Sequence, residues 1–221
     1  MIKNTIKIAL VGQPNVGKSM LINSISNARL KVGNFSGVTV SKEQVFFDYK
    51  NFHIEIIDLP GAYSLNDYTI EEKVTKDFLK NEKYDIILNV LDSTNLQRNL
   101  LLTAELLTLD KKMIIALNMS DEAEKESILI DEIQLSKILG KPCIKTSAAK
   151  KNGITKLLDE ILLKFQSQKV PSKFFFSNVI EEEIENISRV LEENKYETTE
   201  TYRQISLGLL KENKNIYKQF H

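Results

Sequence analysis

The sequence contains almost no cysteine, no tryptophan and no excess of charge of either sign. Cys143 is the single cysteine among 221 residues, which excludes an internal disulfide framework and a multi-cysteine metal site and fits a reducing compartment. Thirty basic residues balance thirty acidic ones, so no general attraction to nucleic acid or to an anionic membrane is expected. No apolar run approaches the ~18 residues that span a bilayer, and the first residues lack the apolar core of a signal peptide. We therefore expect a soluble, cytosolic chain.

Glycine and proline are also scarce, with eight and four occurrences in the whole chain. They gather in short loops instead of being scattered. The residues concerned are Gly12, Pro14 and Gly17, then Gly33 and Gly37, then Pro60 and Gly61. Glycine occurs where the backbone must bend or come close to a ligand. Five of the eight glycines lie in these three loops, which suggests that the loops share a ligand.

What the sequence does contain is an alternation of short β-rich runs with amphipathic helices. Strands are expected at residues 6–11, 44–49, 52–58, 85–91, 112–117 and 142–146, and helices at 18–27, 70–78, 96–109, 131–139 and 154–165. Lys50 and Asn51 separate two of the strands and are predicted to form a hairpin turn. The pattern predicts an α/β domain over residues 1–167, with a mostly parallel six-stranded sheet and one antiparallel edge strand.

The remainder of the chain, residues 168–221, has a different pattern. Residues 167–176 read as a linker, interrupted by Pro171. Asn178 and Glu181 have the spacing of an N-cap and an N3 residue at the start of a helix, and a second helix is expected near residues 199–212. Two helices bury little surface on their own. We therefore predict a C-terminal helical appendage that packs on the main domain or continues into residues beyond this sequence.

The first glycine-containing loop matches the phosphate-binding pattern of P-loop NTPases and has the required strand before it and helix after it. Its residues are Gly12, Gln13, Pro14, Asn15, Val16, Gly17, Lys18 and Ser19, with Met20 next on the helix. Small residues let successive backbone N–H groups point at the phosphates, and the helix presents its positive end. Lys18 can reach the outer phosphates, and the Ser19 hydroxyl can ligate Mg²⁺. The alternative is an ordinary strand–turn–helix with chance glycines.

Two further loops fit the same ligand, one after the strand predicted at 52–58 and one after the helix predicted at 18–27. Asp58 ends a strand and can hold Mg²⁺ through water, while Gly61 can offer its N–H to a terminal phosphate; a plain turn is the alternative. Thr39, within the loop of residues 32–40, is the candidate hydroxyl that joins Mg²⁺ only when a γ-phosphate is present. For Thr39 the alternative is simple β-propensity at the start of a strand.

The loop Asn118-Met119-Ser120-Asp121 carries the prediction of base specificity. The Asp121 carboxylate can accept two hydrogen bonds from guanine, and adenine lacks that pair of donors. Ser120 or Asp121 can also be a helix N-cap. Lysine is more usual at the position of Met119, so we expect weaker retention of the nucleotide. Ser147 and Ala148, at the end of the next strand, can supply a backbone N–H to the guanine carbonyl oxygen.

Taken in order, these loops resemble one family in particular, the bacterial ferrous iron transport protein B. The resemblance rests on Asn15, on Val32-Gly33-Asn34-Phe35-Ser36-Gly37-Val38-Thr39-Val40, on Asp58-Leu59-Pro60-Gly61-Ala62-Tyr63-Ser64-Leu65 and on Asp92-Ser93-Thr94-Asn95-Leu96-Gln97-Arg98-Asn99-Leu100. It implies a GTP-binding and GTP-hydrolysing domain over residues 1–167 and the family's helical domain over residues 168–221. The expected partner is the permease segment of the full-length protein, which is absent here. The expected location is the cytoplasmic side of the bacterial inner membrane.

The resemblance also implies a potassium-stimulated reaction. In this family the asparagine at the position of Asn15 helps to bind K⁺, and carbonyl groups of the loop containing Gly33 and Phe35 complete the site. The resemblance thereby implies catalytic roles for Lys18, Asn15, Thr39 and Gly61. Ala62 stands where Ras-like proteins have the glutamine that positions water, so intrinsic hydrolysis is expected to be slow.

Two other readings stay open at this point. One is an RNA- or ribosome-associated GTPase with the same loops, against which the neutral charge counts. The other is a guanine-nucleotide sensor that does not hydrolyse GTP, which Ala62 allows. A homo-oligomer is also left open. For Arg98, within a stretch that the family matches, a salt bridge on its helix is the simplest expectation.

Overall fold

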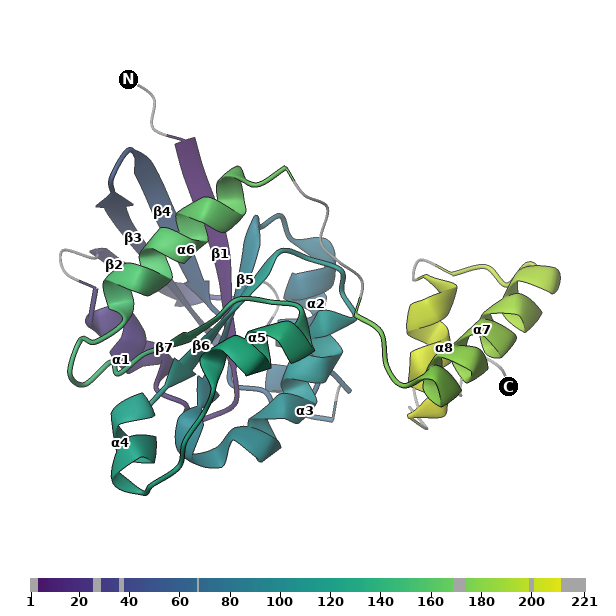
Figure 1. Cartoon of the computed structure of the whole chain (residues 1–221). Coiled ribbons are helices and arrows are strands. Elements are labelled where there is room, and N and C mark those ends of the chain that lie inside the picture. The colour runs from purple at the N-terminus through teal and green to yellow at the C-terminus, as the bar shows by residue number, and fades with distance from the viewer. Residues whose placement is uncertain are drawn as a thin grey trace. The chain divides into compact units, whose positions relative to one another are not determined.

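The computed structural model describes residues 4–25, 29–35, 38–66, 68–168, 174–198 and 201–211. The chain divides into two compact units, the sheet unit of residues 1–172 and the helical unit of residues 173–221 (Figure 1). Within the described residues, no helix combines the length and the apolar character that crossing a bilayer requires.

The sheet unit is built on seven strands in the order β2-β3-β4-β1-β5-β6-β7. Their bounds are β1 Asn4–Gly12, β2 Arg29–Asn34, β3 Ser41–Tyr49, β4 Phe52–Asp58, β5 Ile86–Asp92, β6 Met113–Asn118 and β7 Cys143–Lys145. Strands β4, β1, β5, β6 and β7 run parallel, whereas β3 runs antiparallel to both β4 and β2. The predicted α/β class and mostly parallel sheet are confirmed.

The predicted count of six strands, with one antiparallel strand at the edge, needs correction. β2 is an additional strand and forms the edge, so the antiparallel strand β3 lies inside the sheet. Gly33, which the sequence places in a loop, pairs with Lys42 in this ladder. The side chains of residues 31–34 are all exposed, so this strand lacks the apolar alternation by which a half-buried strand is recognised.

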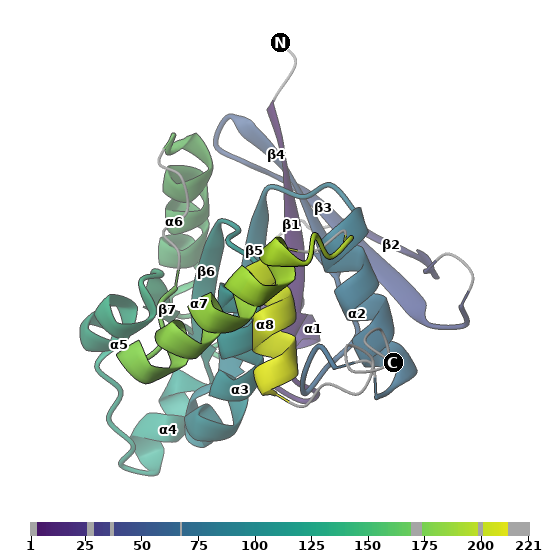
Figure 2. The ribbon, with the colours of Figure 1, turned by 90° about the vertical axis from the view of Figure 1, so that its right-hand side faces the viewer.

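Helices cover both faces of the sheet. One face carries α1 (Lys18–Asn23) and α6 (Ile154–Gln166), whose apolar residues join those of the strands in the core. The residues of this core include Ile6, Ile8, Leu10, Leu21, Ile54, Ile86, Ile114, Leu157 and Ile161. The opposite face carries α2 (Ile70–Asn81) and α3 (Leu96–Leu107), and Figures 1 and 2 show them across the sheet from α6. There Asn89 of β5 donates a 2.8 Å hydrogen bond to Thr103 of α3.

Local signals in the sequence explain most of the element boundaries. Tyr49 pairs with Phe52 across the predicted Lys50-Asn51 turn, which is therefore confirmed. Helix α5 (Glu132–Leu139) begins where the Asp131 side chain accepts hydrogen bonds from two backbone N–H groups, and it ends at Gly140. The short helices η1 (Ser93–Asn95) and α4 (Ser120–Lys125) are not foreseen, because neither is long enough to produce a periodic pattern.

The helical unit consists of α7 (Asn178–Glu193) and α8 (Tyr202–Leu210), as far as it is described. Ser177, not Asn178, is the N-cap of α7, so this helix begins one residue earlier than the spacing predicts. Glu181 does not close a capping box; it accepts a hydrogen bond from the Phe176 N–H and pairs with Arg203 of α8. Thr201 and Gln204 form a true capping box at the start of α8. Part of the predicted linker and both predicted ends of the second helix lie outside the described residues.

Candidate functional site

The candidate site lies at the edge of the sheet where the parallel strands end. The loops that follow β1, β4, β6 and β7 all leave from this carboxyl edge, which is where open α/β sheets bind their ligands. These are the loops that carry the phosphate pattern, Asp58, Asp121 and the Ser147-Ala148 pair. The fold thus brings together residues that are more than a hundred positions apart in the sequence.

The phosphate loop has the backbone geometry that its glycines permit. Gly17 has φ of 84° and is the N-cap of α1, and Asn15 also lies in the left-handed region at 67°. A Cβ on Gly17 would come within 2.5 Å of Nδ2 of Asn118, and one on Gly12 within 2.6 Å of the Val90 carbonyl oxygen. Any larger residue at either glycine would displace a neighbouring strand or loop. Glycine is therefore required at both positions.

The side chains of the phosphate loop divide into buried and open ones. Val16 is buried in the core below the loop. Asn15, Ser19 and Met20 are exposed, and Lys18 is only partly accessible. The loop is thus anchored by Val16 and by the buried Gln13, and it exposes Asn15 and Ser19.

Lys18 and Asp58 form the charged centre of the site. Nζ of Lys18 lies 3.7 Å from Oδ1 of Asp58, which is within ion-pair range and longer than a hydrogen bond. Oδ1 is buried and has no hydrogen-bond partner among the described residues. Burial raises the pKa of Asp58 to about 6, and the nearby Lys18 charge offsets this rise only in part. A buried carboxylate oxygen without a partner, beside a phosphate loop, is the chemistry that a hydrated Mg²⁺ ion would complete.

The segment after Asp58 runs directly along the phosphate loop. The Leu59 N–H donates to the Leu10 carbonyl oxygen at 3.0 Å, and the Ala62 N–H donates to that of Gly12 at 3.2 Å. A Cβ on Gly61 would lie 3.0 Å from Pro14, so only a residue without a side chain fits comfortably there. Ala62 is buried and offers only a methyl group. Backbone groups, not side chains, are therefore what residues 61 and 62 present to a ligand.

Asn118 holds two of the loops together. Its Nδ2 donates to the Val16 carbonyl oxygen at 2.9 Å, while its Oδ1 accepts from the Ala148 N–H at 3.2 Å. The residue is almost wholly buried. Asn118 thus joins the phosphate loop to the loop after β7 through the interior of the protein.

Asp121, the predicted base-recognition residue, is engaged at the surface. Its Oδ2 lies 3.4 Å from Nζ of Lys150, and a hydrogen bond with Ser147 is the main reason why the pKa of Asp121 is lowered. Met119 is the N-cap of α4 in the left-handed region, with φ of 57°, so neither Ser120 nor Asp121 has the alternative role of N-cap. The Ser147 N–H already donates to the carbonyl oxygen of Asn152.

The residues predicted to bind K⁺ come from different elements of the sheet unit. Gly33 lies in β2, and β3 and β4 separate that strand from β1, which leads into the phosphate loop. Phe35 is buried, its ring packs edge-on against Phe78 of α2 with centroids 6.0 Å apart, and its carbonyl oxygen accepts from the Val38 N–H. Thr39 is exposed. The Phe35 carbonyl oxygen therefore has one lone pair engaged, and its second lone pair is the one that could ligate a cation.

Several residues that shape the site carry no recognisable sequence signal. Ser64 donates from both its N–H and its hydroxyl to the buried Glu72 of α2, and the Leu65 N–H donates to the buried Glu105 of α3. Both carboxylates fix the loop after Gly61 from behind. From the sequence alone, glutamates in amphipathic helices are expected to be solvent-exposed. Only the structure shows that these two accept hydrogen bonds from the loop.

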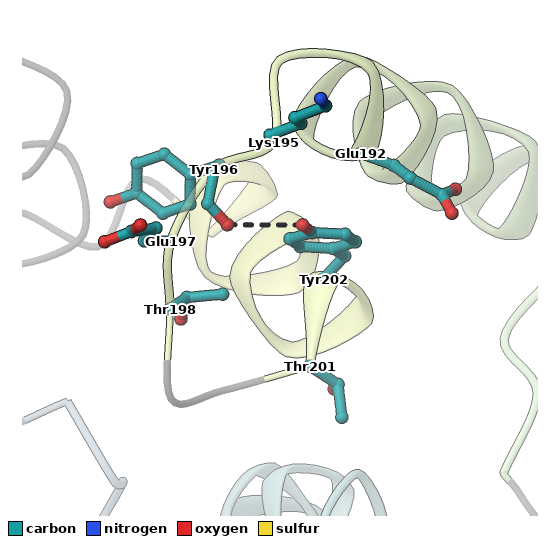
Figure 3. Close-up of a pocket in the computed structure, with 7 residues that line it drawn as sticks. All are labelled: Glu192, Lys195, Tyr196, Glu197, Thr198, Thr201 and Tyr202. Carbon is teal, nitrogen blue, oxygen red and sulfur yellow. Dashed lines mark hydrogen bonds between the residues drawn. The ribbon is translucent and has the colours of Figure 1, made fainter.

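The helical unit has a pocket of its own, unrelated to the predicted site. It is lined by Glu192, Lys195, Tyr196, Glu197, Thr198, Thr201 and Tyr202 (Figure 3). The Tyr202 hydroxyl donates to the Tyr196 carbonyl oxygen at 3.2 Å, which closes part of its wall. None of these lining residues belongs to a predicted nucleotide-binding loop.

Comparisons with known proteins agree with one another. The family described as "Ferrous iron transport protein B" matches residues 6–161. The Fe(2+) transporter FeoB of Helicobacter pylori is 58% identical over 180 residues, which are 77% of this chain and 28% of that protein. The transporter of the same name from Campylobacter jejuni is 53% identical over 176 residues, 80% of this chain and 29% of that protein. The chain therefore spans less than a third of the length of these relatives.

Solved structures with this fold include the cytosolic domain of the T. maritima FeoB iron transporter. One crystal structure, called GDP form II, has a TM-score of 0.89 at 33% identity and covers 98% of this chain and 85% of that chain. The GMPPNP form has a TM-score of 0.86 at 34% identity, with 97% and 84% covered.

Proposed function

This chain belongs to the ferrous iron transport protein B family, a family of P-loop GTPases, and carries its N-terminal G domain; from this premise we propose that residues 1–167 bind and hydrolyse GTP. One observation carries the proposal: a buried Asp58 oxygen that forms no hydrogen bond among the described residues lies 3.7 Å from Nζ of Lys18, next to the phosphate loop. That the T. maritima cytosolic domain has been crystallised in GDP and GMPPNP forms supports the same ligand here.

The phosphate end of the nucleotide would be held by the loop from Gly12 to Ser19. Backbone N–H groups of the loop and of the first turn of α1 surround the phosphates, and Lys18 leaves Asp58 to contact the outer oxygens. When bound, Mg²⁺ would neutralise phosphate charge, with the Ser19 and Thr39 hydroxyls as ligands and the Asp58 carboxylate holding it through water. Gly61 would donate its N–H to the terminal phosphate, because its missing side chain leaves that path open.

The base would be recognised by the loops after β6 and β7. Asp121 would accept two hydrogen bonds from guanine after giving up its ion pair with Lys150. Asn118 would act through its grip on Val16 and Ala148, which fixes the distance between the phosphate and base sites. Met119 would cover the base with an apolar surface, and the backbone of Ser147 and Ala148 would face its carbonyl oxygen.

Hydrolysis would be slow and stimulated by K⁺. Asn15 is exposed next to the phosphate positions and would hold K⁺ together with the carbonyl groups of Gly33 and Phe35. A cation there would supply the charge stabilisation that an arginine supplies in other GTPases. In the full-length protein, the nucleotide state would be relayed through a helical domain, residues 168–221, to a permease that carries Fe(II) across the inner membrane from its cytoplasmic side.

The test is GTP hydrolysis in matched K⁺ and Na⁺ buffers containing Mg²⁺. We expect a higher rate in K⁺, and we expect Asn15→Ala to lose that difference while still binding GDP. Asp121→Asn is expected to relax the preference for guanine over adenine nucleotides. Binding of GTP with no turnover in either salt would instead favour a sensor that does not hydrolyse its ligand. Salt-dependent binding of RNA would favour the alternative of an RNA- or ribosome-associated GTPase.

A further inference from the structure

A stacked pair of side chains joins α3 to the loop that follows Gly61. The guanidinium carbon of Arg98 lies 4.7 Å from the centroid of the Tyr63 ring, well inside the range of a cation–π contact. Within the part of the chain that the structure describes, the partner of Arg98 is this ring and not the carboxylate that a simple helix-surface salt bridge would require. The contact connects residues of two elements that are both next to the phosphate loop.

The phosphate loop itself is tied to the same point. Gln13 is buried, and its Nε2 donates a 2.8 Å hydrogen bond to the Arg98 carbonyl oxygen. The backbone of Arg98 is therefore fixed by the phosphate loop, while its side chain is free to hold Tyr63. Tyr63 is therefore connected to the phosphate loop through Arg98.

Glu72 and Glu105 hold the loop at Ser64 and Leu65, which lie beyond Tyr63 and farther from Gly61 in the sequence. Ala62 has no polar side chain and is buried, so the groups that face a terminal phosphate must be the backbone atoms of residues 61 and 62. On one side that backbone is fixed by the bond from the Ala62 N–H to Gly12. On the other side, Tyr63 follows immediately, and its ring is held by Arg98.

We propose that Arg98 is a positioning residue for GTP hydrolysis: by stacking on Tyr63 it sets the backbone of Gly61 and Ala62 against the terminal phosphate. The inference rests on the proposed GTPase function. Ala62 has no side chain that could orient water. The contact explains how the backbone of Gly61 and Ala62 is nevertheless held in a fixed position. Binding of GDP, which lacks the γ-phosphate, does not require this contact.

The test compares variants that remove one partner with variants that preserve the contact. Arg98→Met and Tyr63→Leu are each expected to lower kcat by about 3- to 5-fold in K⁺ buffer, with KM and GDP affinity nearly unchanged. Arg98→Lys keeps the cation and Tyr63→Phe keeps the ring, so both are expected to retain most of the wild-type kcat. The double variant Arg98→Met with Tyr63→Leu is expected to be no slower than either single one, because both remove the same contact.

The control is Lys111→Met. It removes a comparable contact on another part of the surface, where Nζ of Lys111 lies 5.9 Å from the centroid of the Tyr84 ring. It is expected to leave kcat unchanged, with a melting temperature like that of the Arg98 variants. Wild-type kcat in Arg98→Met and Tyr63→Leu, additive losses in the double variant, or an equal loss in Lys111→Met would each overturn the inference. If Arg98→Met fails to fold, Tyr63→Leu measured against Tyr63→Phe carries the same test.

Failure of this inference can be told apart from failure of the proposed function. A wild-type protein that does not hydrolyse GTP at all contradicts the proposed function. A wild-type protein that hydrolyses GTP, with both single variants equally active, contradicts only the role of Arg98.

Discussion

The two units of the molecule each contain a basic side chain paired with a largely buried carboxylate, and they treat that pair in opposite ways. In the sheet unit, Lys18 and Asp58 stand 3.7 Å apart, and one oxygen of Asp58 has no hydrogen-bond partner among the described residues. In the helical unit, Arg203 donates to both oxygens of Glu181, to one of them at 2.8 Å, and to the Phe174 carbonyl oxygen at 2.9 Å. The first pair is left incomplete, and the second is satisfied.

The difference follows from what each pair does. An unsatisfied buried charge costs stability, so it persists where a ligand repays that cost on binding. The Arg203 guanidinium satisfies both oxygens of the Glu181 carboxylate. Its bond to the Phe174 carbonyl oxygen also fixes the segment before α7 to α8. Under the proposed function, the incomplete pair is where the nucleotide and its metal ion would bind, and the complete pair holds the chain together.

Among the changes that test this comparison, removal of Lys18 should have the largest effect, a loss of affinity for GDP. Lys18→Ala deletes a charge-assisted contact with the phosphates, which is worth up to about 3 kcal/mol, so the affinity for GDP should fall about 100-fold. Titration of a fluorescent GDP analogue measures this directly. Arg203→Ala is the matched control and should bind GDP like the wild type. A comparable loss of affinity in both variants would mean that the two pairs do not differ in function.

Removal of Arg203 should act on stability alone. Arg203→Met leaves Glu181 without its main partner and should destabilise the helical unit by about 2 kcal/mol. Amide hydrogen exchange should then become about 30-fold faster in α7 and α8 and stay unchanged in the strands of the sheet unit. Unchanged exchange in α7 would show that apolar packing, and not the ion pair, holds the two helices together.

The smallest expected effect is on the pH dependence of the free energy of unfolding, to which Asp58 and Glu181 contribute differently. The pKa of Asp58 is raised to about 6 in the folded protein from its ordinary 3.8, so the folded state binds this proton more tightly than the unfolded state. Stability of the nucleotide-free protein should therefore fall by about 1 kcal/mol as the pH rises from ~5 to ~7. Denaturant unfolding at both pH values tests this, and Asp58→Asn should abolish that part of the dependence.

The Glu181 contribution has the opposite sign and a different window. Its pKa is lowered from 4.5, chiefly by the hydrogen bond from Arg203, so its stabilising effect is present above that value and is lost as the pH falls. Glu181→Gln should consequently flatten the acid side of the profile and leave the range from ~5 to ~7 unaltered. A pH 5–7 slope that persists in Asp58→Asn and disappears in Glu181→Gln would reverse the assignment.

Much of the sheet unit can be predicted from sequence because its central strands are largely continuous apolar runs and its loops carry glycine. The runs that become β1 and β5 are buried on both faces, and the phosphate loop between β1 and α1 needs glycine for reasons that any P-loop shares. Strand β2 could not be found in this way, since it is exposed and is recruited by pairing with β3. Its existence is a tertiary effect.

The candidate site shows the same division. Lys18, Asp58 and Asp121 are found from sequence because a pattern of fixed spacing contains them. The stacking of Arg98 on Tyr63, and the bonds of Asn118 to two loops, depend on which surfaces the fold brings together, and no local spacing encodes that. The carbonyl of Phe35 is engaged with Val38, which sequence spacing could not reveal either.

The most direct measurement of the central claim is calorimetric titration of the folded protein with GDP in Mg²⁺ buffer, with ADP as the comparison ligand. If the loop from Gly12 to Ser19 receives the phosphates and Asp121 receives the base, GDP should bind at one site per chain with a large excess of affinity over ADP. Equal affinity for the two nucleotides, or no heat with GDP, would contradict the account.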